Sequence, residues 1–235
     1  MNIKITRDEH EWLESNLPFN EYLYGSRLLG NFTKDSDYDY LRIFNTNDIE
    51  YYYTTAAKYL PNVHALQYTE NQNKQYVWMS ERQFWANFFS GDGSMLTDII
   101  LFCDGFVLEG DKLLLCYSYK VIKGLLGITR RDLKKHKTWE KRVRYSRKSL
   151  YMAECLISKE LPHIDTVKYI LNESLNIQDL PSIQIELSKK ESMLRLKLRD
   201  MLNDNQITFY PQFKEDLHIL DRLIIGNNTK EFRYE

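Results

Sequence analysis

The run GSRLLGNFTKDSDYD, residues 25–39, decides the expected fold. Gly25 lets the backbone approach a phosphate closely, because glycine has no Cβ. Ser26 offers a hydroxyl and a backbone N–H at the expected start of a helix, where amide dipoles favour an anion. Asp37 and Asp39 are two residues apart at the start of an expected strand, so both carboxylates point to one side of the pleat. Beside a triphosphate, two such carboxylates offer the oxygen ligands that Mg²⁺ prefers.

Neither half of this pattern is specific alone. A Gly-Ser pair is common, and Asp-x-Asp is typical of a turn or of a solvated strand start. The two together, separated only by residues 27–36 and each next to an expected strand, are much rarer and indicate a phosphate-and-metal site. Arg27 is predicted either to contact a phosphate or to pair with Asp37, and both alternatives stay open. Arg42, further along the strand, is predicted to be solvated.

Residues 25–40 resemble the signature of the polymerase-β nucleotidyltransferase superfamily, in which Gly-Ser is followed a short distance later by Asp-x-Asp. The version with Arg after Gly-Ser and with Ser-Asp-Tyr-Asp is similar to a branch of predicted bacterial and phage nucleotidyltransferases, including those associated with RNA ligases. Residues 141–162 also resemble the helical second half of that branch. The resemblance implies that Gly25 and Ser26 grip a triphosphate, and that Asp37 and Asp39 hold Mg²⁺ or Mn²⁺.

The chain departs from the superfamily at the third carboxylate, which a later strand normally supplies. An expected hairpin over 63–79 is where this acid should lie, but its second strand contains none, and Gln75 stands where an Asp is expected. Glu70, in the hairpin loop, is the candidate for the third catalytic carboxylate, and Glu81 follows the second strand. Either the third acid comes from a displaced position or the chain has none, and both alternatives stay open. Without one, the fold would bind a nucleotide with weak or no transfer.

The remaining pattern predicts an α+β fold in two domains. We expect a nucleotidyltransferase-like α/β core over 1–110, built as a small mixed sheet flanked by helices, and a helical domain over 111–235. Thr6 is the expected N-cap of the first helix. The expected strands are 21–24, 38–44, 63–68 and 75–79. The expected helices are 5–16, a short turn at 27–30, 48–60, 81–89, 95–102, 111–126, 129–136, 138–159, 163–172, 181–203 and 212–225.

A basic segment over 130–148 is the candidate nucleic-acid contact, with ten Lys or Arg and two acidic residues. On one side of a helix these cations would neutralise several phosphates. Lys141, Arg144 and Lys148 are the members that we expect to be exposed and to bind RNA. The alternative is a solvated amphipathic helix, and the pattern does not decide between the two.

Composition limits the other classes of function. The 235 residues have a net charge of −1, so any attraction to nucleic acid must be local. The three cysteines are Cys103, Cys116 and Cys155, and their apolar surroundings predict buried thiols in a reducing compartment. The start, MNIKITRDEHEW, lacks the apolar region of a secretory signal, and no apolar run approaches a membrane span. We therefore expect a cytoplasmic protein with no membrane partner.

These observations together predict a nucleotidyltransferase. It would transfer a nucleoside monophosphate from a nucleoside triphosphate to an acceptor hydroxyl by a two-metal mechanism. The expected acceptor is an RNA end, on the strength of the basic segment and the associations of the family, while a protein hydroxyl or a small molecule stays open. The rival prediction is a non-catalytic nucleotide- or RNA-binding module that keeps the fold but lacks the third carboxylate. The base, the acceptor and the oligomeric state are not decided by the sequence.

Overall fold

The computed structural model describes residues 2–44, 65–71, 73–91, 94–134 and 138–210. The expected helices 48–60 and 212–225 lie outside these residues. The chain divides into two compact units, Met1–Asn87 and Phe88–Glu235. The boundary thus lies inside a helix and earlier in the chain than the predicted boundary after Gly110.

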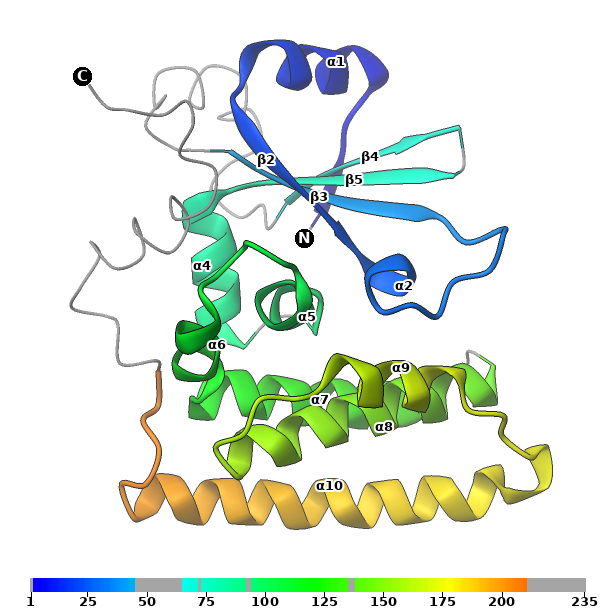
Figure 1. Cartoon of the computed structure of the whole chain (residues 1–235), viewed down its shortest axis with the longest axis vertical. Coiled ribbons are helices and arrows are strands. Elements are labelled where there is room, and N and C mark those ends of the chain that lie inside the picture. Colours follow the sequence, from blue (N-terminus) through cyan, green and yellow to red (C-terminus); the bar gives the residue numbers. More distant parts are fainter. Residues whose placement is uncertain (1, 45–64, 72, 92–93, 135–137, 211–235) are drawn as a thin grey trace. The chain divides into compact units, whose positions relative to one another are not determined.

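The first unit is built on a five-stranded mixed sheet with the strand order β1-β4-β5-β3-β2 (Figure 1). β3 pairs in parallel with β5 and antiparallel with β2, whereas β4 pairs antiparallel with β5 and parallel with β1. The mixed sheet agrees with the α+β prediction; β1 was not predicted, because three residues carry too little alternation to recognise. The strands are β1 (Asn2–Lys4), β2 (Phe19–Tyr24), β3 (Tyr38–Phe44), β4 (Ala65–Glu70) and β5 (Lys74–Ser80).

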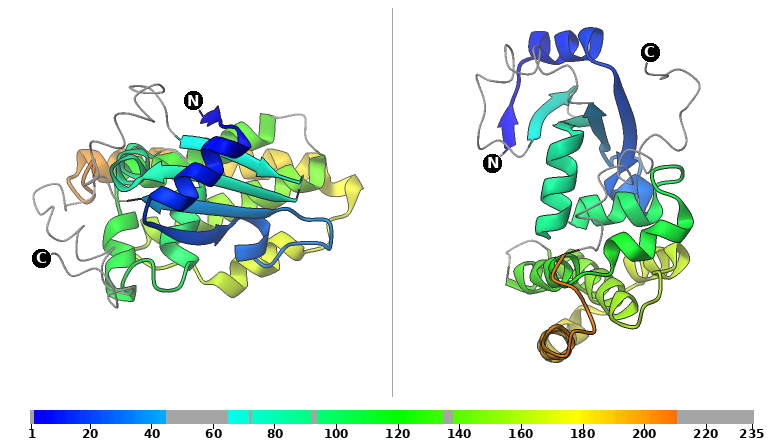
Figure 2. Two further views of the ribbon diagram at one scale, coloured as in Figure 1. Left: turned by 90° about the horizontal axis from the view of Figure 1, so that it is seen from above. Right: turned by 90° about the vertical axis from the view of Figure 1, so that its left-hand side faces the viewer.

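Helix α1 (Arg7–Asn16) crosses one face of this sheet (Figure 2). Thr6 caps it as predicted: its hydroxyl accepts a hydrogen bond from the Glu9 N–H, and its own N–H donates to Glu9 Oε2 at 2.8 Å. This reciprocal capping box satisfies two backbone N–H donors at the helix start, those of Thr6 and Glu9. The helix buries its inner face in an apolar cluster with the sheet. The buried members of that cluster are Ile5, Leu13, Leu17, Phe44, Leu66, Tyr76 and Trp78.

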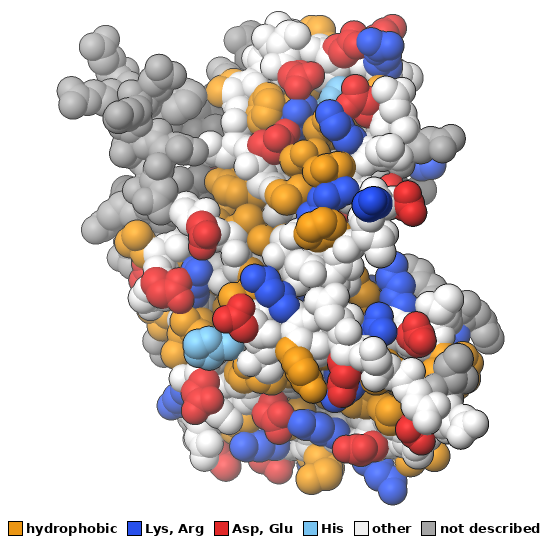
Figure 3. All heavy atoms as spheres, turned by 45° about the vertical axis from the view of Figure 1, so that its right-hand side comes forward, with side chains coloured by type: hydrophobic (Ala, Val, Ile, Leu, Met, Phe, Trp, Pro, Cys, Tyr) orange, Lys and Arg blue, Asp and Glu red, His pale blue; other side chains and the backbone are white. Residues whose placement is uncertain are grey.

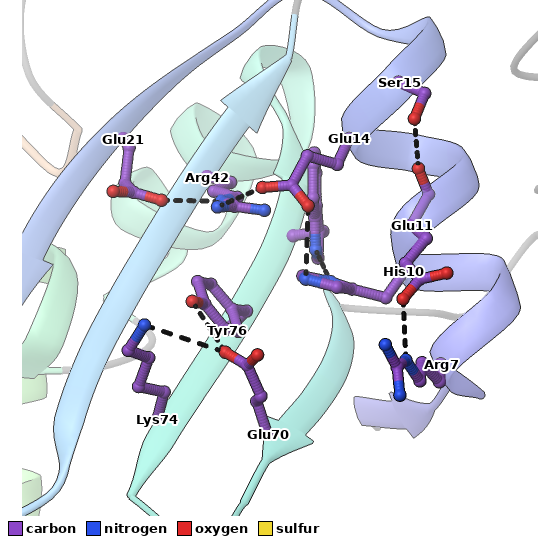
Figure 4. Close-up of polar contacts among 11 residues, drawn as sticks. Arg7, His10, Glu11, Glu14, Ser15, Glu21, Arg42, Glu70, Lys74 and Tyr76 are labelled. Carbon is purple, nitrogen blue, oxygen red and sulfur yellow. Dashed lines mark hydrogen bonds and ion pairs between the residues drawn. The ribbon is translucent and has the colours of Figure 1, made fainter.

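Arg42 lies in the same layer, so the prediction that it is solvated is wrong. Only 5% of Arg42 is exposed. Its guanidinium forms ion pairs with Glu14 at 3.0 Å and Glu21 at 2.7 Å (Figure 4). It also lies over three aromatic rings, which favour a cation at their faces. These rings belong to Phe19, Tyr76 and Trp78. Both carboxylates come from other elements, which a pattern along β3 cannot reveal.

The second unit is helical, as predicted for the later part of the chain. α7 packs against α8, and α10 packs against both (Figure 1). Within the described residues, no helix combines the length and the apolar character that crossing a bilayer requires. The helices are α4 (Glu81–Ser90), which begins in the first unit, α5 (Ser94–Phe102), α6 (Glu109–Cys116), α7 (Tyr119–Lys134), α8 (Trp139–Ile157), α9 (Ile164–Asn172), the 3₁₀ helix η3 (Ile177–Asp179) and α10 (Leu180–Asn203).

The core of the second unit follows the predicted helix faces. In α8 the buried stripe contains Val143, Leu150, Ala153 and Ile157, and in α10 it contains Leu187, Leu194, Leu198 and Met201. The expected break between helices 111–126 and 129–136 is wrong, because α7 continues through Gly127 and the break falls before Tyr119. All three cysteines are buried and free, as predicted. Burial raises the pKa of the Cys103 thiol to about 11.

His10 links α1 to the sheet as a neutral side chain. It is 5% exposed. The Trp78 indole Nε1–H donates to His10 Nδ1 at 3.1 Å, and the imidazole stacks on Tyr68 with 4.2 Å between the ring centroids. Burial, and then the charge of Arg42, lower the pKa of His10. The folded state therefore binds a proton at His10 less readily than the unfolded chain does.

We expect acid to destabilise the protein through His10. The free energy of unfolding should fall as the pH falls below the unfolded pKa of about 6.5, by at most about 1.4 kcal/mol per pH unit for this one proton. The His10→Gln variant keeps an acceptor for the indole but does not titrate. Urea unfolding between about pH 7.5 and pH 5 should therefore show a weaker pH dependence for this variant than for the wild type. Identical pH dependence in both proteins would contradict the assignment.

Candidate functional site

Gly25 packs directly against the carboxylate of Asp39. It follows β2 directly and begins the single turn α2 (Gly25–Leu28), and its φ of +70° is a conformation that glycine adopts easily. A Cβ at this position would overlap Asp39 Oδ2 and would lie 3.3 Å from Asp39 Cγ. The antiparallel pairing of Tyr24 with Asp39 brings the two residues together. Glycine is therefore required for both the turn and the close approach.

Asp37 and Asp39 lie at the same end of β3. Asp37 immediately precedes β3, and Asp39 is its second residue, so both carboxylates belong to one side of the pleat. The parallel register pairs Asp39 with Gln75 of β5. Gln75 Nε2 donates to Asp37 Oδ2 at 3.2 Å. β5 thus presents an amide, and no carboxylate, to the two aspartates.

Arg27 fixes the loop between α2 and β3. Its Nη2 donates to the Ser36 carbonyl at 2.8 Å, and its Nε donates to the Asp37 carbonyl at 3.3 Å. The guanidinium also lies over the Tyr38 ring, 3.4 Å from its centroid. Arg27 therefore reaches the backbone of Asp37 and holds the loop that presents its carboxylate. Ser26 is half-buried, and its carbonyl accepts a hydrogen bond from the Asn31 N–H at 3.0 Å.

Tyr24 is a neighbour of the site that the sequence pattern did not single out, although it directly precedes Gly25. Burial, and then the negative charge of Asp39, raise the pKa of its phenol. Tyr24 therefore stays neutral at physiological pH and can donate a hydrogen bond. The charge at this point of the sheet is carried by the aspartates.

The residues present fit one divalent cation. Asp37 and Asp39 are both half-buried and supply hard oxygen ligands, and the oxygen of the Gln75 amide is of the same ligand class. Among the described residues, no point gathers three or more His, Cys, Asp or Glu side chains. The described chain therefore offers two carboxylates for an Mg²⁺ or Mn²⁺ ion, with nucleotide phosphates as the expected source of further ligands.

The structure does not bring Glu70 to the two aspartates. Glu70 accepts a hydrogen bond from the Tyr76 hydroxyl at 3.3 Å and lies 3.8 Å from the Lys74 ammonium (Figure 4). Tyr76 belongs to the face of the sheet that α1 covers, whereas Asp39 and Gln75 lie on the other face. Burial, and then Glu70, raise the pKa of Tyr76 to about 12. Glu81 follows the last residue of β5, at the opposite end of the strand from Gln75.

The basic segment does not form the predicted exposed row. Lys141 is exposed and Arg144 is half-buried, but Lys148 is only 1% exposed, so the prediction of an exposed Lys148 is wrong. Its ammonium donates to Asp98 Oδ2 of α5 at 2.5 Å. Burial raises the pKa of Asp98, and the charge of Lys148 opposes this shift. On the face that Figure 3 presents, basic and acidic side chains are interspersed.

Comparison of the chain with models of protein families gave no match. Comparisons with curated proteins and with solved structures also gave none. The geometry of the site and the motif in residues 25–40 are therefore the features that bear on function.

We expect the ion pair between Lys148 and Asp98 to stabilise the folded protein. The Lys148→Met variant leaves the buried Asp98 carboxylate without its partner, which typically costs about 3–5 kcal/mol. The double variant Lys148→Met/Asp98→Leu removes both charges and should recover most of this loss. Urea unfolding of the three proteins measures the difference. A single variant as stable as the wild type would show that the pair does not hold the helices together.

Proposed function

We propose that the chain binds a nucleoside triphosphate with a divalent cation at Gly25, Asp37 and Asp39, and transfers the nucleoside monophosphate to an acceptor hydroxyl. The observation that carries this proposal is the contact between Gly25 and the Asp39 carboxylate. It places a carboxylate directly beside the backbone of a tight turn, so a cation held by that carboxylate and a phosphate held by the turn would lie together. The resemblance of residues 25–40 to the polymerase-β signature supports the same assignment.

The proposed roles follow from the contacts. Asp37 and Asp39 hold the cation, and the Gly25–Ser26 backbone faces the phosphates. The Gln75 amide orients the Asp37 carboxylate, while Arg27 fixes the loop that carries it. A bound Mg²⁺ would neutralise the charge on the triphosphate. In the transfer, a bond forms between the acceptor oxygen and the α-phosphorus, the bond to the bridging oxygen breaks, pyrophosphate leaves, and the hydroxyl proton passes to water.

Gln75 favours a second candidate function, which is nucleotide binding without transfer. Two carboxylates suffice to hold one cation on a triphosphate. Activation of an acceptor hydroxyl by a second cation requires additional negative ligands, and the superfamily supplies a carboxylate for this step. An amide that donates to Asp37 carries no charge and holds a second cation less well. Binding and transfer therefore have to be measured separately.

We expect the Asp37→Asn/Asp39→Asn variant to lose both activities. Each labelled nucleoside triphosphate is incubated with the protein, Mg²⁺ or Mn²⁺ and bulk RNA, and label in the RNA is counted. Transfer should fall at least about 100-fold, the usual cost of removing a preorganised electrostatic group. The matched control is Asp35→Asn, an exposed acid in the same loop, which should behave as the wild type. Measurable transfer that is equal in the wild type and the double variant would refute the proposed site.

The Gln75→Asp variant separates the two candidate functions. If the wild type binds triphosphate but does not transfer, the new carboxylate should create transfer. If the wild type transfers already, the rate should rise by about tenfold or more, because a charged ligand strengthens the second cation site. Gln75→Asn has the size of Asp but keeps an amide, so it controls for the shortened side chain. Equal rates for the Asp and Asn variants would exclude a metal role at this position.

A further inference from the structure

The second unit contains a basic groove of about 770 Å³ between α7 and α10. Its lining has five cations and one carboxylate, although the whole protein has a net charge of −1. The charge of the groove is therefore a local feature that the composition conceals. The cations are Lys123, Arg130, Lys134, Arg195 and Arg199, and the carboxylate is Glu191.

The spacing along α7 explains one wall of the groove. Lys123, Arg130 and Lys134 are seven and four residues apart, so they lie on one face of the helix. All three are exposed. Gly127 lies on the same face, and no atom comes within 4 Å of the place where its Cβ would be. The glycine thus leaves open space between the cations.

Helix α10 runs antiparallel to α7 and forms the other wall. Gln184, near the start of α10, donates from Nε2 to the Leu133 carbonyl at the end of α7, at 3.1 Å. At the other end, the Tyr119 N–H donates to the Thr208 carbonyl beyond α10. Arg195 and Arg199, one turn apart, therefore face the first half of α7. Cations line both walls along the length of the groove.

The single carboxylate does not neutralise this charge. Glu191 is 6% exposed and is paired with Arg195 on its own helix, at 2.6 Å from Nε to Oε1. Arg130 and Lys134 form no ion pair with any of the described residues. Arg199 pairs with Asp200 at 3.6 Å, so the groove cations without an ion pair among the described residues lie on α7. These cations repel one another, and a polyanion along the groove relieves that repulsion.

We propose that this groove binds the phosphodiester backbone of single-stranded RNA. Lys123 and Lys134 are separated by about 16 Å along the axis of α7, which is long enough to follow several phosphates. Tyr119 at one end stacks on Phe209, with 5.4 Å between ring centroids and 18° between the planes, and Lys123 Nζ lies 5.3 Å from the Tyr119 centroid. Aromatic rings and a cation thus adjoin at this end of the groove, a combination that suits a nucleotide. The choice of RNA over other polyanions rests on the proposed transfer to an RNA hydroxyl; the groove would hold that acceptor.

The test is direct binding without nucleotide or metal, so its outcome does not depend on transfer. The probe is a fluorescein-labelled oligouridylate of about 16 nucleotides, followed by anisotropy over a range of salt concentrations. The groove variant is Arg130→Gln/Lys134→Gln. The control is Lys189→Gln/Lys197→Gln, which removes two exposed charges from α10 outside the groove. Circular dichroism confirms that both variants are folded.

We expect the groove variant to bind the RNA at least about tenfold more weakly, with a salt slope shallower by about 1.4 for two lost phosphate contacts. The control should stay within about twofold of the wild type. No binding by the wild type, or equal losses in both variants, would overturn the proposal. Tighter binding of the matching DNA oligomer, or of a labelled glutamate oligomer, would overturn the assignment of RNA as the occupant.

Discussion

The contact between Gly25 and the Asp39 carboxylate is the constraint on which the functional assignment of the first unit depends. It arises because β2 pairs antiparallel with β3 and ends in a turn that glycine adopts easily. The same strand pairing fixes which side chains β3 presents to each face of the sheet. Asp39 faces the candidate site, whereas Arg42 faces α1 and its two carboxylate partners. Alternation along one strand thus places the buried Arg42 and the half-buried Asp39 on opposite faces of the sheet.

The two faces also differ in how their charges are satisfied. Arg42 and His10 are buried among partners from other elements, and burial lowers the pKa of His10. Asp37 and Asp39 are half-buried, and Gln75 gives Asp37 a neutral donor rather than a counter-charge. A neutral amide donor does not balance the negative charge of Asp37, which favours a nearby cation. Under the proposed function, this arrangement would favour a metal-bound phosphate, and the capacity for a second metal would depend on Gln75.

Local signals in the sequence were sufficient for local structure. The strand 38–44 was predicted with the bounds that the structure gives it, and Thr6 caps α1 because its partner Glu9 is three residues away. The position of Gln75 was also recognised, but its bond to Asp37 depends on the parallel register of β3 and β5. Lys148 and Arg42 were misplaced because their partners lie far away in the chain. The basic groove was missed for the same reason, since a run of cations over 130–148 does not show that Arg130 and Lys134 line one groove with Arg195 and Arg199 of α10.

The most direct test of the central claim is the binding of Mn²⁺, measured by electron paramagnetic resonance with and without a nucleoside triphosphate. The account predicts that triphosphate and Mn²⁺ bind together, that phosphorus nuclei couple to the bound ion, and that replacing Gly25 with Ala abolishes this signal while the protein stays folded. A signal of unchanged strength in that variant would contradict the account, because the side chain added there would occupy the space beside Asp39.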